Sequence, residues 1–467
     1  MKNSFKHLTR GAARTRAAAR SLLCTLSPHL EITNFFKRLT RGTTRTRPTI
    51  PIDPEPYQEP KLPFELILLI LEDLSVPELQ ACALVCRAWR YPSQKHLFST
   101  LRLLDIFLGG KLQTFGARCI KWQDRLEESP HLATYLSRLH ISSVMLREKS
   151  DLVLARNIAP KLSHLQSLHI WGGRLGEQEA VWYKEFVAYL KPSIRSLWLF
   201  RSYTWDQEIL SMPGITSLSV HHPGVCKWDT STPAAPPILG NLKRLELSGF
   251  EDCSSLLDFF ISPSFDFANL RHLELDFGWR TSQPMSPPFV SFLDKMPTLM
   301  DTLVISLPPA LRYDDEPDQF SFLPDLITRK PLSRFQHLQR VAITVSEASP
   351  RGLAMGRELL HTLDIPELRE LSIALSFHSE TVSLEKIVAL GESSEWKVLD
   401  DYFSDRDRFR CLERFEVTKI PDHALEEVQN PDYVARFRDM VPFVEEQMPV
   451  LSERRMLYFV VATKPFI

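Results

Sequence analysis

A short pattern of hydrophobic residues recurs throughout the chain after residue 135. It reads apolar-x-x-apolar-x-apolar, and its last four residues alternate between apolar and polar, which is typical of a β-strand with one buried face. One strand and one return segment fit the spacing between copies, so we predict a stack of parallel strands built from repeats. The ten copies occupy residues 136–141, 165–170, 194–199, 215–220, 242–247, 270–275, 300–305, 338–343, 368–373 and 412–417.

Between these strands, the sequence predicts segments that return the chain to the next repeat. Helical periodicity in residues 177–190 and 352–363 predicts helices on the outside of the sheet. The longer gaps, residues 306–337 and 374–411, are expected to hold insertions. An acidic run at residues 313–318 lies in the first of them.

The C-terminal end of the chain departs from the repeat pattern. Residues 432–448 are predicted to form an amphipathic helix. Residues 456–462 are almost entirely apolar and are predicted to form a buried last strand. Together, these two elements are expected to cap the array.

The alternation within each strand predicts which residues share the exposed, concave face of the sheet. Reading across the repeats gives one column of residues: His140, His169, Trp198, Ser219, Glu246 and Glu274. A second column contains Ser142, Trp171, Phe200, His221, Ser248 and Asp276. Exposed aromatic residues are common in interface hot spots, so these columns suggest a substrate-docking patch, with acids that favour a basic partner segment. An insertion or the N-terminal tail covering these rings is the alternative. The candidate substrate-binding residues are His169, Trp171, Trp198, Phe200, His221 and Glu246.

A second pattern, with helical spacing, occupies residues 62–98. Its first part carries an apolar face, and its second part continues that face as far as Trp89. Between the two parts, Ser75 and Glu78 have the spacing of a capping box, and Pro77 is acceptable in a first helical turn. A segment this short can build only a small hydrophobic core. Such a unit therefore commonly packs its apolar face against a partner.

These residues resemble the F-box family, with His96-Leu97-Phe98 similar to the family's usual exit. The resemblance implies a three-helix motif that binds the adaptor Skp1 and links the chain to a cullin-RING ubiquitin ligase. Pro92 departs from the family pattern, and we expect it to shorten the third helix, because proline lacks an N–H donor. The positions that carry the resemblance, and that it implies contact Skp1, are Leu62, Pro63, Leu66, Ile70, Leu74, Pro77, Leu79, Val85, Cys86 and Trp89.

The repeats resemble the irregular leucine-rich-repeat arrays found beside F-boxes, especially in large fungal families. We therefore predict an α/β fold: an irregular leucine-rich-repeat solenoid preceded by a small three-helix F-box and a disordered basic tail. The expected divisions are a basic tail and proline-rich linker, an F-box, a connecting helical segment, and the solenoid with its cap. Their boundaries are residues 1–55, 56–105, 106–135 and 136–467.

The overall net charge of −1 hides a basic N-terminal tail. Residues 1–50 contain eleven lysines and arginines and one acidic residue, Glu31, which leaves a net charge of −11 for the remainder. Within this tail, the stretch that begins at Phe5 is repeated from Phe36. Such a composition suits a mitochondrial presequence, contact with nucleic acid or an anionic membrane surface, or a duplicated leader without a function.

Candidate chemistry is scarce in this sequence. No glycine-rich phosphate loop, HExxH, paired CxxC or nucleophile elbow occurs, so we expect a binding protein and no enzyme. His221, His222 and Cys226 fit no standard metal site, and no cofactor is expected. The seven scattered cysteines suggest reduced intracellular thiols. Cys82 and Cys86 could share a helix face as metal ligands, but without a second pair or a nearby histidine we expect them to pack in the core. No apolar run reaches the length of a membrane span.

The resemblance implies a function as the substrate-recognition subunit of an SCF-type (Skp1-cullin-F-box) ubiquitin ligase, located in the cytoplasm, the nucleus or both. Its partners would be Skp1, through it a cullin-RING ligase, and an unknown protein substrate held by the repeats. We do not expect a nucleic-acid partner. The alternative is an F-box and repeat scaffold that acts with Skp1 outside a ligase.

Overall fold

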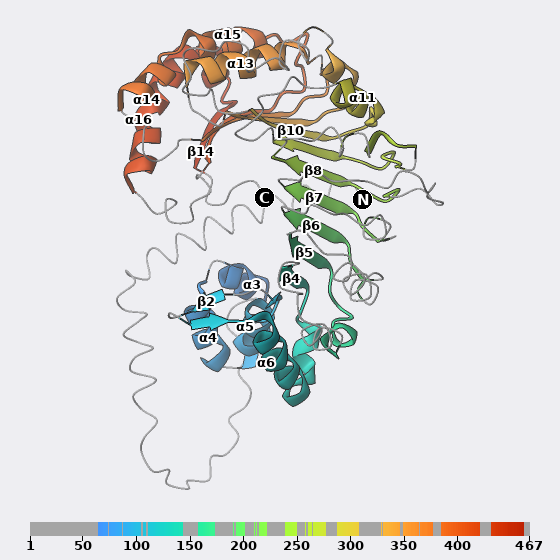
Figure 1. The fold of residues 1–467 in the computed structure, drawn as a ribbon. Coiled ribbons are helices and arrows are strands. Elements are labelled where there is room, and N and C mark those ends of the chain that lie inside the picture. Colours follow the sequence, from blue (N-terminus) through green and yellow to red (C-terminus); the bar gives the residue numbers. More distant parts are fainter. Residues whose placement is uncertain are drawn as a thin grey trace. The chain divides into compact units, whose positions relative to one another are not determined.

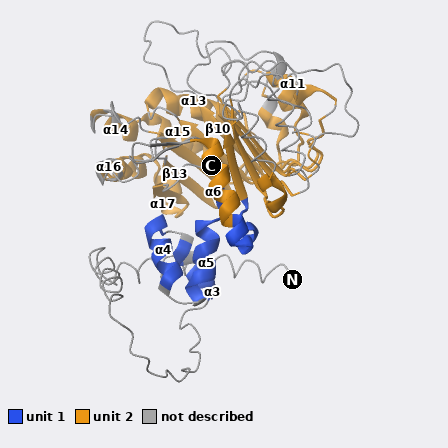
Figure 2. Ribbon diagram, turned by 60° about the horizontal axis from the view of Figure 1, so that its bottom comes forward, with its two compact units in different colours: residues 1–101, 126–137 blue, residues 102–125, 138–467 orange. Residues whose placement is uncertain are grey.

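The computed structural model describes most of the chain from residue 64 to residue 461 and divides it into two compact units (Figure 2). One contains residues up to Leu101 together with Leu126–Ser137, and the other contains Arg102–Arg125 and the chain from Arg138. The described residues are 64–72, 74–85, 87–103, 106–108, 111–142, 157–172, 190, 193–200, 210, 212, 214–221, 239–249, 257, 260–263, 265–276, 287–307, 328, 330–345, 349–363, 365–376, 384–420 and 431–461.

The first unit is built on three short helices that share a small core. The helices are α3 (Phe64–Glu72), α4 (Val76–Val85) and α5 (Arg87–Leu97). The predicted apolar face is buried between them, with Ile67, Leu71 and Leu79 at its centre; Leu74, Cys82, Trp89 and Leu97 pack around these three while remaining partly exposed. The 3-10 helix η1 (Pro130–Thr134) belongs to the same unit.

One of the two hydrogen bonds of the predicted capping box forms at the start of α4. The Ser75 N–H donates to Glu78 Oε2 at 2.7 Å, which satisfies one of the amides that a helix start leaves unpaired. The Ser75 hydroxyl donates to the same oxygen at 2.7 Å. The sequence signature therefore marked the boundary between the first two helices correctly.

The prediction for Pro92 was wrong. Helix α5 continues through Pro92 to Leu97, so the proline does not shorten it. Pro92 is buried, as is its neighbour Ser93. Proline removes a single hydrogen-bond donor, and packing of its ring in the interior offsets part of that loss.

The second unit is organised by one long parallel sheet (Figure 1). Among the described residues, it contains twelve strands in the order β1-β4-β5-β6-β7-β8-β9-β10-β11-β12-β13-β14, and each pair from β4 to β14 is parallel. All ten predicted strands are confirmed, and each begins at the third residue of its pattern. They are β4 (Arg138–Ser142), β5 (Ser167–Trp171), β6 (Ser196–Phe200), β7 (Ser217–His221), β8 (Arg244–Ser248), β9 (His272–Asp276), β10 (Thr302–Leu307), β11 (Arg340–Val345), β12 (Glu370–Ser376) and β13 (Arg414–Ile420).

The apolar positions of the pattern form the core behind this sheet. Leu139, Leu168 and Leu197 align on successive strands and are fully buried, as are their equivalents up to Phe415. Helix α13 (Pro350–His361) packs against this face, because a Cβ placed on Gly356 would lie 3.5 Å from Ile343 Cγ2. Each strand thus buries one row of side chains between the sheet and the return segments.

Helices lie on the same side of the sheet as α13 in the C-terminal part of this unit (Figure 1). The predicted helix at 352–363 is confirmed by α13, and the one at 432–448 by α16 (Pro431–Gln447). The gap at 374–411 holds two helices, α14 (Leu384–Gly391) and α15 (Ser394–Phe403). The remaining short helices are α11 (Pro287–Lys295), α17 (Pro449–Glu453), η3 (Ala159–Lys161) and η5 (Pro331–Arg334).

Other parts of the chain differ from the prediction or fall outside the description. The last strand, β14 (Leu457–Val461), forms but is not buried: it is the final strand in the sheet order, and Tyr458 is 43% exposed. The expected connecting segment contains α6 (Phe115–Glu128), and also the antiparallel strands β2 (Ile106–Leu108) and β3 (Lys111–Gln113). The basic tail, the predicted helix at 177–190 up to residue 189, and the acidic run at 313–318 lie outside the described residues.

Candidate functional site

The face of the sheet opposite α13 brings the predicted columns together. His140, His169, Trp198, Ser219, Glu246 and Glu274 are direct neighbours across β4 to β9, and so are Ser142, Trp171, Phe200, His221, Ser248 and Asp276. The period-two reading of the sequence is therefore confirmed at the level of individual residues. The six candidate substrate-binding residues all lie on this face, within β5 to β8.

The N-terminal part of this face is an aromatic patch, which we define as His140, His169, Trp171, Trp198, Phe200 and His221. Neighbouring rings contact one another: His140 stacks on His169 with centroids 4.3 Å apart, and His169 stacks on Trp198 at 5.3 Å. Trp198 lies parallel to Phe200 at 5.5 Å and contacts Trp171 at 5.3 Å. Trp171 is 39% exposed, so the patch offers a ring surface to a ligand.

Two histidines of this patch, His140 and His169, carry no charge near neutral pH. Burial lowers the pKa of His140, and the positive charges of Arg102 and Arg138 contribute to the same shift, which brings the pKa to about 4. Burial also lowers the pKa of His169 to about 4, with smaller contributions from His140, Arg138 and His221. Both rings are therefore neutral and stack as uncharged aromatic surfaces.

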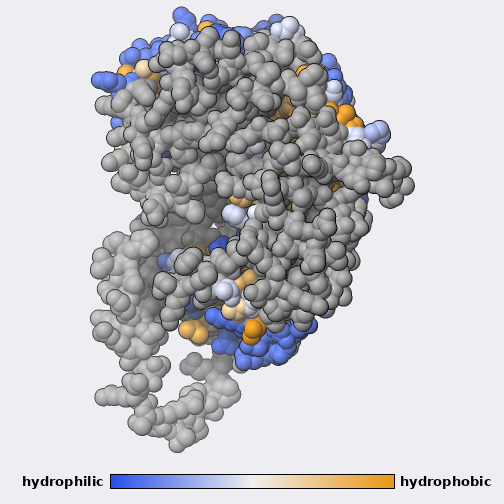
Figure 3. All heavy atoms as spheres, in the orientation of Figure 1, coloured by the Kyte–Doolittle hydropathy of each residue, from blue (hydrophilic) through white to orange (hydrophobic). Residues whose placement is uncertain are grey.

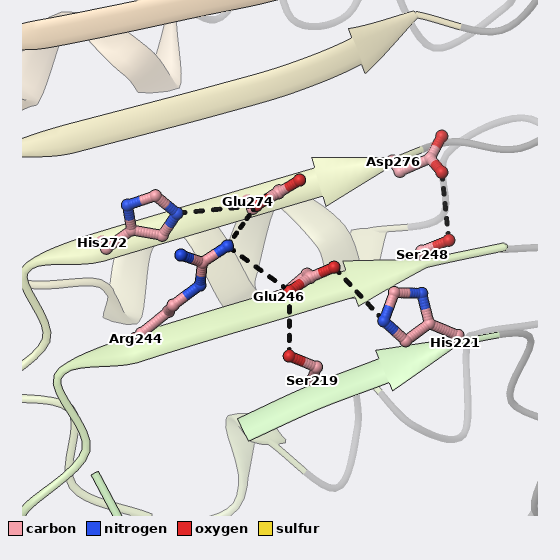
Figure 4. Close-up of polar contacts among 8 residues, drawn as sticks. All are labelled: Ser219, His221, Arg244, Glu246, Ser248, His272, Glu274 and Asp276. Atoms are coloured by element: carbon pink, nitrogen blue, oxygen red, sulfur yellow. Dashed lines mark hydrogen bonds and ion pairs between the residues drawn. The ribbon is translucent and has the colours of Figure 1, made fainter. Parts of the chain in front are cut away.

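Next to the aromatic patch, β7 to β9 carry a polar network (Figure 4). Glu246 accepts a hydrogen bond from Ser219 Oγ at 2.8 Å and lies 3.2 Å from His221 Nε2. Arg244 bridges two carboxylates, with Nη2 at 2.9 Å from Glu274 and 3.6 Å from Glu246. This network continues to His272, whose Nε2 lies 3.5 Å from Glu274, and a separate bond runs from Ser248 Oγ to Asp276 Oδ2 at 3.0 Å.

The acids of this network are occupied within the protein. Glu246 is only 5% exposed. Burial alone would raise the pKa of its carboxyl, but the contacts with His221, Ser219 and Arg244 outweigh burial, so the pKa lies below its usual value. Glu246 is thus ionised, and its neighbours neutralise its charge. The sequence suggested that this acid would attract a basic partner, but the paired carboxylate offers no free charge to one.

Two functional side chains escaped the sequence reading because they occupy the first position of their strands. Arg244 and His272 share a face with the two predicted columns, since residues two apart on a strand point the same way. The same alternation, extended by one step toward the N-terminus of each strand, could have identified both.

Two arginines border the aromatic patch on the side of β1 (Thr100–Leu103). Arg138 is the first residue of β4, and Arg102 lies in β1; both are exposed. The Ser137 N–H donates to Ser99 O at 2.9 Å, with the same offset as between the other strand pairs, so Arg102 lies beside His140. Among the described residues, neither guanidinium makes an ion pair.

The helical unit presents a different kind of surface. Of the residues implied to contact Skp1, Pro77 is exposed, Leu66 and Ile70 are partly exposed, and Leu74 and Trp89 pack against the core. Leu79 is 6% exposed and belongs to the core itself. Val85 is the last residue of α4, and Leu62, Pro63 and Cys86 lie outside the described residues.

Exposed apolar side chains accompany these positions on the three helices. Phe64, Val76 and Tyr91 are 49%, 59% and 54% exposed, and Leu84 is 80% exposed. The other large hydrophobic side chains exposed among the described residues are Ile120, Trp171, Leu299, Tyr458 and Val461. On the face drawn in Figure 3, the coloured hydrophobic residues form small separate groups. Exposed apolar side chains on so small a helical unit are what a docking surface requires.

Comparison with known families supplies the decisive observation for this region. Residues 60–103 match the F-box-like family model. The F-box-like region therefore includes Leu62, Pro63, Val85 and Cys86, and it extends beyond Pro92 into β1. Domains of this family mediate protein–protein interactions and typically bind Skp1. No curated protein matches the sequence.

Other kinds of site find no support in the described part of the chain. No group of three or more His, Cys, Asp or Glu side chains there could hold a metal ion. No described helix is both long enough and apolar enough to cross a membrane. Cys82, Cys119 and Cys411 are free thiols, and Cys82 packs at the edge of the F-box-like core.

Proposed function

We propose that this chain is the substrate-recognition subunit of an SCF-type ubiquitin ligase. The F-box-like region would bind Skp1, and the parallel sheet, which we interpret as an irregular leucine-rich-repeat solenoid of the fungal F-box type, would bind a protein substrate. The observation that supports this proposal most strongly is the family match over residues 60–103. We place this activity in the cytoplasm, the nucleus or both.

In this role the chain performs no chemistry of its own. Ubiquitin transfer would belong to other subunits of the ligase, and this protein would hold the substrate close to them. Holding two reactants together raises their effective concentration and restricts their orientation, so a binding protein accelerates transfer without a catalytic residue.

Co-purification tests the proposal directly. The tagged full-length chain is expected to capture Skp1 and a cullin from cells. Skp1 without a cullin would instead support the scaffold that acts outside a ligase, and capture of neither would reject both functions.

A matched pair of variants tests whether the exposed apolar surface of the F-box-like region makes the contact. Leu84→Asp places a charge on the 80% exposed side chain in α4 and is expected to lower Skp1 affinity at least about tenfold, because hot-spot truncations at interfaces commonly cost 2 kcal/mol or more. Ile120→Asp in α6, at a side chain that is 50% exposed on the other unit, is expected to leave Skp1 affinity unchanged. Equal affinities of the two variants would exclude Leu84 from the interface.

A further inference from the structure

The charges around the aromatic patch indicate what kind of segment the sheet face can accept. Its carboxylates are paired: Glu246 with His221 and Arg244, and Glu274 with Arg244 and His272. The free charges lie at the opposite border of the patch. There, Arg102 and Arg138 are exposed, and within the described structure no carboxylate pairs with either.

These arginines and the rings share one face of the sheet. Arg138 precedes His140 by two residues on β4, so both side chains point the same way. Arg102 lies on the next strand, beside His140. From there the rings continue without a break: His140 stacks on His169, and His169 stacks on Trp198.

Among the described residues, no carboxylate forms an ion pair with either arginine at this border. Burial, Arg102 and Arg138 together lower the pKa of His140 to about 4. His140 and His169 are therefore neutral, and they extend the ring surface without adding charge. The result is a cationic border beside the stacked rings of His140, His169 and Trp198.

We propose that this part of the sheet face binds an acidic segment of a partner protein that also carries aromatic or long apolar side chains. Its carboxylates would pair with Arg102 and Arg138, since guanidinium groups form charge-assisted hydrogen bonds with carboxylates. Its apolar side chains would lie on Trp171, Trp198 and Phe200. This assignment rests on the proposed function, in which the sheet receives the substrate, and it reverses the basic partner expected from the sequence.

Two short synthetic peptides of equal length test the assignment on the full-length chain. One alternates Glu-Asp with Phe, and the other alternates Lys-Arg with Phe; both carry a fluorescent label for anisotropy titration. The acidic peptide is expected to bind at least about tenfold more tightly, and this preference is expected to decrease with added salt, since exposed charge pairs are screened.

Charge reversal locates the site. Arg102→Glu with Arg138→Glu is expected to lower affinity for the acidic peptide about tenfold and to raise affinity for the basic one. Arg340→Glu is the matched control, because Arg340 is exposed on the same face but is already paired with Glu370. Trp171→Ala with Trp198→Ala should weaken the binding of both peptides, because the uncharged tryptophan rings contact the Phe side chains that both peptides carry.

Several outcomes would overturn the proposal: tighter binding of the basic peptide, binding of neither peptide, or an unchanged affinity after reversal of both arginines. A single-stranded oligonucleotide that binds more tightly than the acidic peptide would also reject a peptide ligand. The acidic run at residues 313–318 of this chain could itself occupy the sheet face. Exchange of its acidic residues for Ser and Asn tests that alternative. A gain in peptide affinity after that exchange would assign the face to this segment and reject the partner.

Skp1 capture separates this proposal from the function on which it rests. The doubly reversed variant is expected to capture Skp1 as the unchanged chain does, because both arginines belong to the unit of the sheet. Arg102 is the next-to-last residue of the F-box-like match, so Arg138→Glu alone, outside that match, is the control for Skp1 capture. Failure of the unchanged chain to capture Skp1 would reject the ligase role but leave the peptide result standing. Failure of the peptide preference with intact Skp1 capture would reject only the acidic partner.

Discussion

At the scale of single residues, the sheet face carries stacked rings beside carboxylates that are hydrogen-bonded or ion-paired. His221 contacts both groups: its ring lies 5.0 Å from that of Trp198, and its Nε2 lies 3.2 Å from Glu246. A buried carboxylate without such partners would be costly, so Ser219 and Arg244 are needed where Glu246 is buried. Glu246 thus holds Ser219, His221 and Arg244 in one network across three strands.

The shifted pKa values predict that stability falls on mild acidification. His140 and His169 have a folded-state pKa of about 4, below the ordinary 6.5, so the unfolded chain binds more protons between these values and stability decreases as pH falls from 6.5 toward 4. Glu246 has a lowered pKa and adds stability above its ordinary value of 4.5, which is lost at lower pH. The melting temperature measured from pH 7 to pH 5 reports the contribution of the histidines, because Glu246 titrates below this range.

Replacing both histidines tests this linkage. His140→Phe with His169→Phe keeps two stacked rings and removes the titration, so the melting temperature is expected to depend less on pH in that window. An equal pH dependence in the unchanged protein and the variant would show that the pair does not couple to folding.

At the scale of elements, packing between helices depends on residues too small for a sequence pattern to reveal. Gly391 ends α14, and a Cβ there would lie 2.9 Å from the Cβ of Phe443 in α16. Gly240 has no heavy atom within 4 Å of such a Cβ, and neither glycine has a left-handed backbone. The two positions therefore form a matched pair for the same substitution.

Gly391→Ala is expected to lower the free energy of unfolding by about 1–3 kcal/mol, because the added methyl group forces α14 away from α16. Gly240→Ala should change it by no more than about 0.5 kcal/mol. Urea unfolding of the two variants measures both values. A similar loss in both would mean that helix packing at Gly391 is looser than the structure indicates.

The elements also show what the sequence could and could not predict. Ten strands and the register of two columns followed from alternation alone, because burying one face fixes which residues point inward. The pairing of Glu246 with His221 and Arg244 could not be predicted, since it depends on side-chain conformations across three strands. Arg102 was missed because β1 lacks the repeat pattern, and α5 runs through Pro92 because packing overrides local propensity.

At the scale of the whole molecule, the two proposed binding surfaces lie on different units. The F-box-like region has its own core around Ile67 and Leu71, and the sheet has a continuous core of its own. Substitutions on exposed side chains of one unit should therefore leave binding by the other unchanged. Such independence is what a protein that connects a ligase to a substrate requires.

Trp198→Ala with Phe200→Ala tests this independence in cells. The double variant is expected to lose substrate capture and retain Skp1, because it removes two rings of the aromatic patch and no residue of the F-box-like region. Tyr458→Ala is the matched control: Tyr458 is an exposed aromatic residue aligned with Glu416, at the far end of the same sheet.

Proximity labelling with the Leu84→Asp variant identifies the substrates whose capture is tested. Without Skp1, a bound substrate would escape ubiquitination and accumulate near the chain, so true substrates should be enriched there. They should disappear when Trp198→Ala and Phe200→Ala are added, and remain when Tyr458→Ala is added. Enrichment that survives loss of both rings would place substrate binding elsewhere, because hot-spot aromatics carry most of the binding energy at an interface.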